Sequence, residues 1–234
     1  MLDKQLVSFD YAIPYLLKDQ ANYDIIEEFL SALVGVAGYS PVKINTLLEM
    51  QDADFAKFPG KSLADLIVQD AKGIKYIIAI DRVHSHFLHR SCFRASKLIA
   101  GHFKGRNGRD IAKVFHIGLL YSPPNELQDP VYYRKMVVRG VGQDKDDICE
   151  ALDLKMPEYF LVAVPRFNGI IKTALDEWLY LLKNSDIKDD CKSLCVSKIK
   201  EHLSISRMSE GERQGYVDYL KHIAQEEKGE AIYD

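Results

Sequence analysis

The stretch Ser62–Asp81, which reads SLADLIVQDAKGIKYIIAID, constrains the fold more strongly than any other part of this 234-residue chain. Two apolar runs flank a short polar turn. The segment Asp70–Ile74 suits a three-residue hairpin loop, with Gly73 in the left-handed conformation that glycine adopts easily. The stretch therefore predicts two antiparallel strands, and the isoleucines of the second strand favour a central place for it in a sheet.

Two acids stand in these apolar strands, and the loop predicts how they are related. With a loop at residues 71–73, Asp65 pairs with Ala79, and Asp81 lies on the same face one diagonal step away, about 7–8 Å between backbones. A buried carboxylate is costly unless a cation, hydrogen bonds or a proton relieves it, and one divalent ion takes oxygen ligands from two carboxylates over such a distance. The alternative is a pair of strand-end aspartates that are hydrated or paired with a nearby lysine or arginine. A one-residue slip of the register would move Asp81 to the other face.

A long helix is expected after the hairpin, from about His86 to Lys104, because HSHFLHRSCFRASKLIAGHFKG separates into two faces at the helical period. Its apolar stripe consists of Leu88, Cys92, Ala95, Ile99 and Phe103. Its basic face, which we expect to contact nucleic-acid phosphates, consists of His86, Arg90, Arg94, Lys97 and Lys104. No Asp or Glu lies between Asp81 and Asp110, whereas most surface helices mix the two signs. The alternative is a solvated face whose charges meet acids elsewhere in the fold.

The rest of the chain predicts a mixed central sheet of about five strands surrounded by helices. We expect residues 1–168 to form this α/β core and residues 169–234 to form a helical C-terminal section, packed on the core or extending it. Outside the hairpin, the expected elements are a helical opening at 9–36, strands at 40–50, 112–121, 132–140 and 158–167, and helices at 170–184, about 187–204 and from 209 onward. Ser209 and Glu212 have the spacing of a capping box at the start of the last helix.

Composition and cysteine usage exclude several classes of protein. The formal net charge is −3, so any nucleic-acid contact has to come from a local patch. No run of about 18 apolar residues and no signal-peptide pattern occurs, so neither a membrane span nor secretion is expected. The four cysteines, Cys92, Cys149, Cys191 and Cys195, form no CxxC pair, and we expect reduced thiols in a cytoplasmic protein. A zinc pair at Cys191 and Cys195 is the weaker alternative, because no further Cys or His lies at finger-like spacing.

Several segments, spread over most of the chain, occur in an order and spacing that are typical of one family. They are FDYAIPYLL, IIEEFLSALVG, LADLIVQDAKGIKYIIAID, HFLHRSCFRASKLIAGHFKGR, VAVPRF, LDEWLYLLKN and MSEGERQGYVDYLK, of which EWLYLLKN is the most specific. In these segments the chain resembles the PD-(D/E)XK nuclease family transposases, also called recombination-promoting nucleases. The resemblance implies a restriction-endonuclease-like α/β fold, with a mixed central sheet flanked by helices and a helical C-terminal section.

The resemblance also implies magnesium-dependent cleavage of DNA. In the family, an aspartate on the first hairpin strand and a Glu-x-Gln or Asp/Glu-x-Lys motif on the second strand bind metal and position the attacking water. Asp65 matches the first acid. The second motif falls on Ala79-Ile80-Asp81, so an alanine without any ligand atom replaces the motif glutamate. Because Asp81 supplies a carboxylate two residues further on, the expected catalytic and metal-binding residues are Asp65 and Asp81.

Related nucleases also use an acid from the first helix, which here would be Glu27 or Glu28. Both are expected to point away from the apolar face formed by Ile26, Leu30 and Leu33, which argues against this role. Lys97 of the basic helix is a candidate for the water-orienting lysine.

Three functions are compatible with these observations. The first is a DNA-associated member of the family whose cleavage is impaired or lost because of Ala79. The second is an active DNA endonuclease that hydrolyses phosphodiesters with Asp65 and Asp81, and Mg²⁺ or Mn²⁺ is a cofactor only in this case. The third is a protein-interaction module that never binds DNA.

Overall fold

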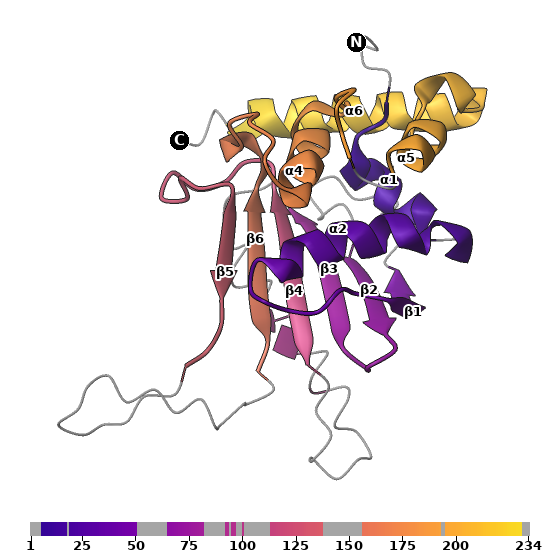
Figure 1. The fold of residues 1–234 in the computed structure, drawn as a ribbon. Coiled ribbons are helices and arrows are strands. Elements are labelled where there is room, and N and C mark those ends of the chain that lie inside the picture. The colour runs from indigo at the N-terminus through magenta and orange to yellow at the C-terminus, as the bar shows by residue number, and fades with distance from the viewer. Residues whose placement is uncertain are drawn as a thin grey trace, which may run out of the picture.

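The computed structural model describes most of the chain. The described residues are 6–17, 19–50, 65–81, 92–93, 95–96, 100, 113–137, 156–192 and 195–230. They form a six-stranded sheet surrounded by helices (Figure 1).

The sheet is mixed, with the strand order β1-β2-β3-β4-β6-β5. The central strands β3, β4 and β6 run parallel to one another, and the other neighbouring pairs are antiparallel. The strands are β1 (Ile44–Met50), β2 (Asp65–Asp70), β3 (Lys75–Asp81), β4 (Val114–Leu120), β5 (Val131–Arg134) and β6 (Glu158–Ala163). The predicted α/β class, a mixed central sheet flanked by helices with a helical C-terminal part, is confirmed, with six strands where about five were expected.

The hairpin between β2 and β3 has the register that its loop predicts. Asp65 pairs with Ala79 across the two strands. The backbone N–H of Asp70 donates to the carbonyl of Ile74 at 3.0 Å, and Gly73 has a φ of 80°. The carboxylate of Asp70 accepts from the Ile74 N–H at 2.8 Å, which further stabilises the turn.

The N-terminal opening folds as two helices joined by a single 3₁₀ turn. These elements are α1 (Phe9–Leu16), η1 (Gln20–Asn22) and α2 (Tyr23–Gly35). The predicted apolar face of α2 is confirmed, because Ile26, Phe29, Leu30 and Leu33 are all fully buried. Gly38, at a φ of 80°, lies just beyond the end of the helix.

The C-terminal section is helical, as predicted. Its elements are α4 (Ala174–Asn184), α5 (Val196–His202), the 3₁₀ helix η3 (Ile205–Arg207) and α6 (Glu210–Glu230). The predicted capping box of α6 is confirmed, since the Ser209 N–H donates to Glu212 at 2.8 Å while the Glu212 N–H donates back to the Ser209 hydroxyl at 3.3 Å. A second capping box, between Thr173 and Asp176, starts α4 and was not predicted.

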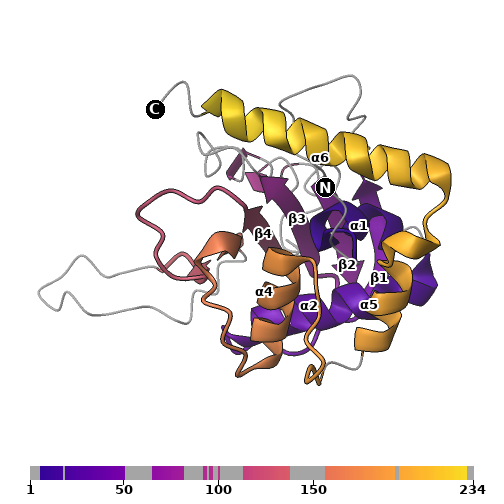
Figure 2. The same ribbon diagram turned by 90° about the horizontal axis from the view of Figure 1, so that it is seen from above.

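The C-terminal helices pack on the N-terminal helices. Trp178 of α4 lies against the rings of Phe9 and Phe29, at centroid distances of 5.1 and 5.6 Å. On α6, the Tyr219 hydroxyl donates to the buried carboxylate of Asp10. Helix α1 therefore lies between α2 and α6, as both views show (Figures 1 and 2). The boundary expected between residues 168 and 169 stays a prediction.

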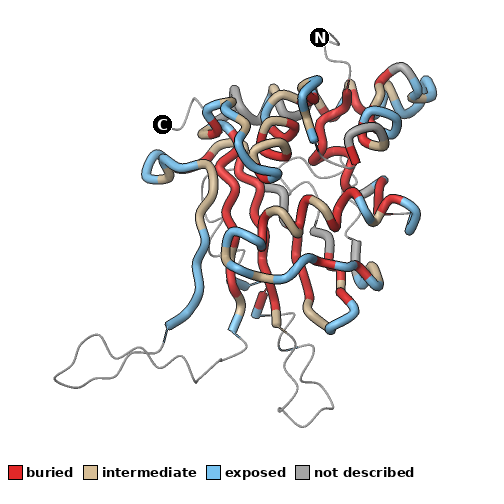
Figure 3. Tube along the Cα trace, viewed as in Figure 1, coloured by how far each residue is buried: buried red, intermediate tan, exposed pale blue. Residues whose placement is uncertain are grey.

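The central strands are buried along most of their length (Figure 3). Because successive side chains of a strand point to opposite sides, these residues line two faces of the sheet. The first, which we call the α2 face, packs against α1, α2 and α4 and includes Val68, Ile78, Phe115, Ile117 and Phe160. The second, which we call the Ala95 face, includes Ile67, Ile77 and Val114, and the helical residue Ala95 packs against it.

Several predicted elements are shorter than expected, including β1, which begins at Ile44 instead of residue 40, and α4, which begins at Ala174 instead of residue 170. Strand β5 ends at Arg134 instead of residue 140, and residues 135–137 are not in a strand. Strand β6 ends at Ala163, and a 3₁₀ turn, η2 (Val164–Arg166), follows because Pro165 has no N–H to extend the ladder. The helix expected over about 187–204 covers only α5, and the residues before it form a turn closed by the bond from Cys191 N to Lys188 O at 3.2 Å.

The absence of a membrane span and the presence of reduced cysteines were predicted for the whole chain, and the structure bears on the described part of it. None of the helices in the described part combines the length and the apolar character that crossing a bilayer requires. Among the described residues, Cys92, Cys191 and Cys195 form no disulfide, and Cys149 lies outside the described residues.

Candidate active site

One edge of the sheet gathers the ends of four strands. Strands β3 and β4 end side by side, with Asp81 paired to Leu120, and Leu120 is paired in turn to Ala163 at the end of β6. Strand β2 runs the opposite way and begins at this edge with Asp65. Asp65 and Asp81 therefore lie at the same edge of the sheet.

The strand register also relates these positions to the two faces. Asp65 is two residues before Ile67, and Asp81 is four residues after Ile77; both isoleucines belong to the Ala95 face. Because positions two apart in a strand share a face, residues 65, 79 and 81 all belong to the Ala95 face. The structure describes the backbone at these positions and not their side chains, so the expected joint metal-binding role of Asp65 and Asp81 stays a prediction.

Next to Asp65, the two neighbouring strands carry the smallest residues at the paired positions. Ala79 is the direct cross-strand partner of Asp65, and on its other side Ala79 pairs with Gly118 of β4. Neither residue carries an oxygen or nitrogen side-chain atom. Compared with the arrangement that the family resemblance implies, the position of the motif glutamate holds no donor atom, and the second carboxylate stands two residues further on, at Asp81.

The acids of α2 do not supply the missing carboxylate. Glu27 is buried, and its carboxylate accepts from the Ile44 N–H at 2.8 Å and from the Lys43 ammonium at 2.6 Å. The burial of Glu27 was not predicted: the start of β1 folds over this flank of α2. Ile44 pairs with Asp70, at the turn end of β2, which is five residues or about 17 Å from Asp65.

Glu28, the other acid considered on α2, faces α5. Its carboxylate is hydrogen-bonded to the Cys195 thiol. Burial, together with this carboxylate, raises the pKa of Cys195 to about 12. Across the part of the chain described here, no three His, Cys, Asp or Glu side chains are grouped so as to hold a metal ion.

The basic face of the helix after the hairpin cannot be placed from the structure. His86, Arg90, Arg94, Lys97 and Lys104 lie outside the described residues. Two members of the predicted apolar stripe are described: Ala95 is fully buried on the sheet, as expected, whereas Cys92 is exposed. Ala95 packs on the same face of the sheet to which positions 65, 79 and 81 belong.

A second polar cluster, which the sequence reading missed, lies at the opposite edge of the sheet. Glu158, the first residue of β6, is 4% exposed and accepts hydrogen bonds from the Lys113 ammonium and from the hydroxyls of Tyr39 and Tyr133. Burial alone would raise the pKa of Glu158, but these three donors outweigh it and hold the pKa below its ordinary value. The four residues come from separate segments, so no local sequence pattern identifies them. Because all three donors bind the same carboxylate, the cluster stabilises the packing of these segments against one another.

Comparison with known protein families agrees with the fold. The sequence model of the PD-(D/E)XK nuclease family transposases matches residues 7–229, nearly the whole chain. Searches of curated proteins and of solved structures returned no match. The match spans the hairpin, the strands of the central sheet and the C-terminal helices, and the chain therefore belongs to the PD-(D/E)XK nuclease family transposases.

Proposed function

We propose that this chain is a DNA-associated member of its family in which cleavage is impaired or lost. The observation that carries the proposal is the register of the hairpin, which sets Ala79 directly opposite Asp65. Family membership makes DNA the expected partner and a divalent ion the expected cofactor of an intact site. In such a site the ion activates water and neutralises charge on the phosphate.

Two further observations support a loss of activity. Gly118, beside Ala79, provides no ligand, so the small residues extend over two neighbouring strands. Glu27 is held at the far end of β1 by Lys43 and the Ile44 N–H, so it does not substitute for the missing glutamate. A metal site that loses one carboxylate ligand loses affinity and catalytic competence together.

DNA association is proposed to depend on the basic face of the helix after the hairpin. Its five cationic or titratable residues are His86, Arg90, Arg94, Lys97 and Lys104. Ala95 of this segment packs on the face to which positions 65 and 81 belong, so we expect the basic residues to lie near the candidate active site. Binding through phosphates should weaken steeply as salt rises, whereas a protein-interaction module without DNA contacts would bind independently of Arg90, Arg94 and Lys97.

The decisive experiment restores the family motif. Purified wild-type protein, incubated with supercoiled DNA and Mg²⁺ or Mn²⁺, should leave the DNA intact, and the double variant Ala79→Glu/Asp81→Gln should nick it. The control adds Asp65→Ala to the double variant, which should abolish the restored cleavage. Clear cleavage by the wild type would reject the proposal.

An active endonuclease is the alternative, and one observation favours it. The confirmed register gives Asp81 the diagonal position relative to Asp65, so a site shifted by two residues retains two carboxylates. This alternative expects wild-type cleavage that either Asp65→Ala or Asp81→Ala abolishes while the circular dichroism spectrum stays unchanged. Unaltered cleavage by both variants would exclude it.

We also infer that residues 1–168 form the nuclease-like core, with residues 169–234 packed on it, in a cytoplasmic protein. The contacts of Trp178 with Phe9 and Phe29 support this packing. Deleting residues 169–234 should expose the α1 and α2 surfaces that these helices cover, and the fragment should bind a hydrophobic dye and unfold without a cooperative transition.

A further inference from the structure

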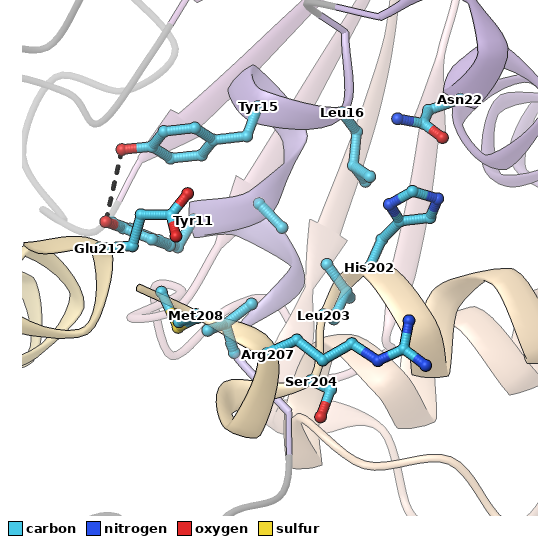
Figure 4. A pocket seen from close by; sticks show the side chains of 12 residues that line it. Tyr11, Tyr15, Leu16, Asn22, His202, Leu203, Ser204, Arg207, Met208 and Glu212 are labelled. Carbon is cyan, nitrogen blue, oxygen red and sulfur yellow. Dashed lines mark hydrogen bonds between the residues drawn. The ribbon is translucent and has the colours of Figure 1, made fainter. Parts of the chain in front are cut away.

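A cavity of about 190 Å³ lies among the helices, away from the sheet edge that carries Asp65 and Asp81 (Figure 4). It opens between α1, the turn from α5 into η3, and the first turn of α6. Its lining residues are Val7, Tyr11, Ala12, Tyr15, Leu16, Asn22, His202, Leu203, Ser204, Arg207, Met208 and Glu212. None of them belongs to the candidate active site or to the Glu158 cluster.

One side of the cavity offers hydrogen-bond donors and a positive charge. Figure 4 shows Asn22, His202 and Arg207 together on this side. Asn22 is only 6% exposed, and its side chain does not cap α2. Because Asn22 lines the cavity, its amide can hydrogen-bond to a ligand bound there. Arg207 uses one nitrogen, Nη1, to bind Glu201 at 2.5 Å, and its other N–H groups remain to bind an anionic group.

The opposite side combines aromatic rings with an acceptor. Tyr15 is 49% exposed, and its hydroxyl donates to the Tyr11 hydroxyl at 3.4 Å, the bond that is drawn in Figure 4. Burial raises the pKa of Tyr11, so this phenol keeps its own proton at neutral pH. Hydrogen bonds from Ser209 lower the pKa of Glu212, so its carboxylate is ionised and accepts hydrogen bonds.

Apolar side chains separate these two polar sides. Val7, Ala12, Leu16 and Leu203 are buried, and they form the wall between the basic side and the acidic side together with the half-buried Met208. The cavity thus matches a molecule with an anionic group at one end, a flat apolar body, and a hydrogen-bond donor at the other end. Nucleotides with an amino group on the base have this order of groups.

We propose that this cavity binds a nucleoside 5′-monophosphate whose base carries an exocyclic amine. The phosphate lies against Arg207, His202 and the Asn22 amide. The base packs on the apolar wall beside the ring of Tyr15, and its amine donates to the carboxylate of Glu212.

The test measures binding of adenosine 5′-monophosphate to the full-length protein by isothermal titration calorimetry. Inosine 5′-monophosphate is the matched ligand, because it replaces the amine with a carbonyl that Glu212 would repel. We expect saturable binding of the adenosine nucleotide, and binding about tenfold weaker or worse for the inosine nucleotide, for adenosine without phosphate and for inorganic phosphate alone.

Two variants locate the site. Arg207→Gln should weaken binding of adenosine 5′-monophosphate by about tenfold, whereas Lys221→Gln, which removes an exposed cation on α6 outside the cavity, should leave it unchanged. Glu212→Gln keeps a residue type that capping boxes accept, and it should remove the preference for adenosine over inosine nucleotide. The proposal is overturned if no nucleotide binds saturably, if phosphate alone binds equally well, or if Arg207→Gln leaves the affinity unchanged. Because cleavage of DNA is not part of this assay, its result is independent of the proposed function.

Discussion

The two edges of the sheet place acids in similar positions at strand ends, but the surroundings of those acids differ. At one edge, Glu158 begins β6 and receives three hydrogen bonds, from Lys113, Tyr39 and Tyr133. At the other edge, Asp65 begins β2 opposite Ala79, and Ala79 is followed by Gly118 in the next strand. An acid at the end of an apolar strand is therefore no evidence of catalysis by itself. The residues on the neighbouring strands and loops decide whether the acid stabilises the fold through hydrogen bonds or is left to bind a ligand such as a metal ion.

The largest effect on stability is expected when the Glu158 carboxylate is removed. Glu158→Ala leaves a buried ammonium and two phenols without their acceptor, and we expect the free energy of unfolding to fall by about 3–5 kcal/mol. Urea denaturation measures this loss in the free energy of unfolding. The control is Glu201→Ala, which breaks an exposed pair with Arg207 and should leave the midpoint unchanged. A loss no larger than the control's would show that the Glu158 cluster is not structural.

The same cluster predicts a pH dependence with a definite sign. Because the pKa of Glu158 is lower in the folded chain than its ordinary value of 4.5, its contribution to stability is present above about pH 4.5 and is lost as the pH falls through the folded pKa. The stability difference between wild type and Glu158→Gln should therefore shrink as the pH falls below this value. A difference that stays constant between pH 7 and pH 3 would contradict the lowered pKa.

Removing one donor should have a smaller effect. Tyr133 is 37% exposed, and Tyr133→Phe deletes its hydrogen bond to Glu158 while keeping the ring against Phe160. We expect a loss of about 1 kcal/mol in the free energy of unfolding, because Lys113 and Tyr39 remain as donors. Thermal unfolding of this variant beside Tyr132→Phe, whose hydroxyl accepts from Gln128 N and Asp129 N instead, would separate the Glu158 bond from a general effect of tyrosine hydroxyls.

The smallest effect on stability is expected at the other edge. Asp65→Asn should leave the free energy of unfolding unchanged or raise it by about 1 kcal/mol, because an acid that stands in a site rather than in an internal bond network contributes little to the fold. Chemical denaturation of this variant measures the change. A loss comparable to that of Glu158→Ala would make Asp65 a structural residue, and the contrast between the two edges would disappear.

The elements that sequence reasoning predicted well are those with local causes. The pairing of Asp65 with Ala79 follows from the five-residue turn Asp70–Ile74, whose conformation is determined by Asp70 and Gly73. The apolar face of α2 follows from helical periodicity, and the start of α6 follows from the spacing of Ser209 and Glu212.

The errors have non-local causes. Periodicity identified the apolar face of α2, but it gave no sign that Ile44 would lie against the flank of that helix and bury Glu27. The Glu158 cluster joins Tyr39 to a residue 119 positions away, so it depends on the tertiary fold alone. Arg134 ends β5 early for a reason that the strand's own residues do not reveal.

The most direct test of the account measures metal binding, without any DNA. Mn²⁺ is titrated into the wild type, into Ala79→Glu/Asp81→Gln, and into that double variant carrying Asp65→Ala, and binding is followed by calorimetry. The account predicts no saturable Mn²⁺ site in the wild type, a site in the double variant, and its loss when Asp65 is removed. A wild-type Mn²⁺ site that disappears in both Asp65→Ala and Asp81→Ala would contradict the claim that Ala79 leaves this edge of the sheet without a complete metal site.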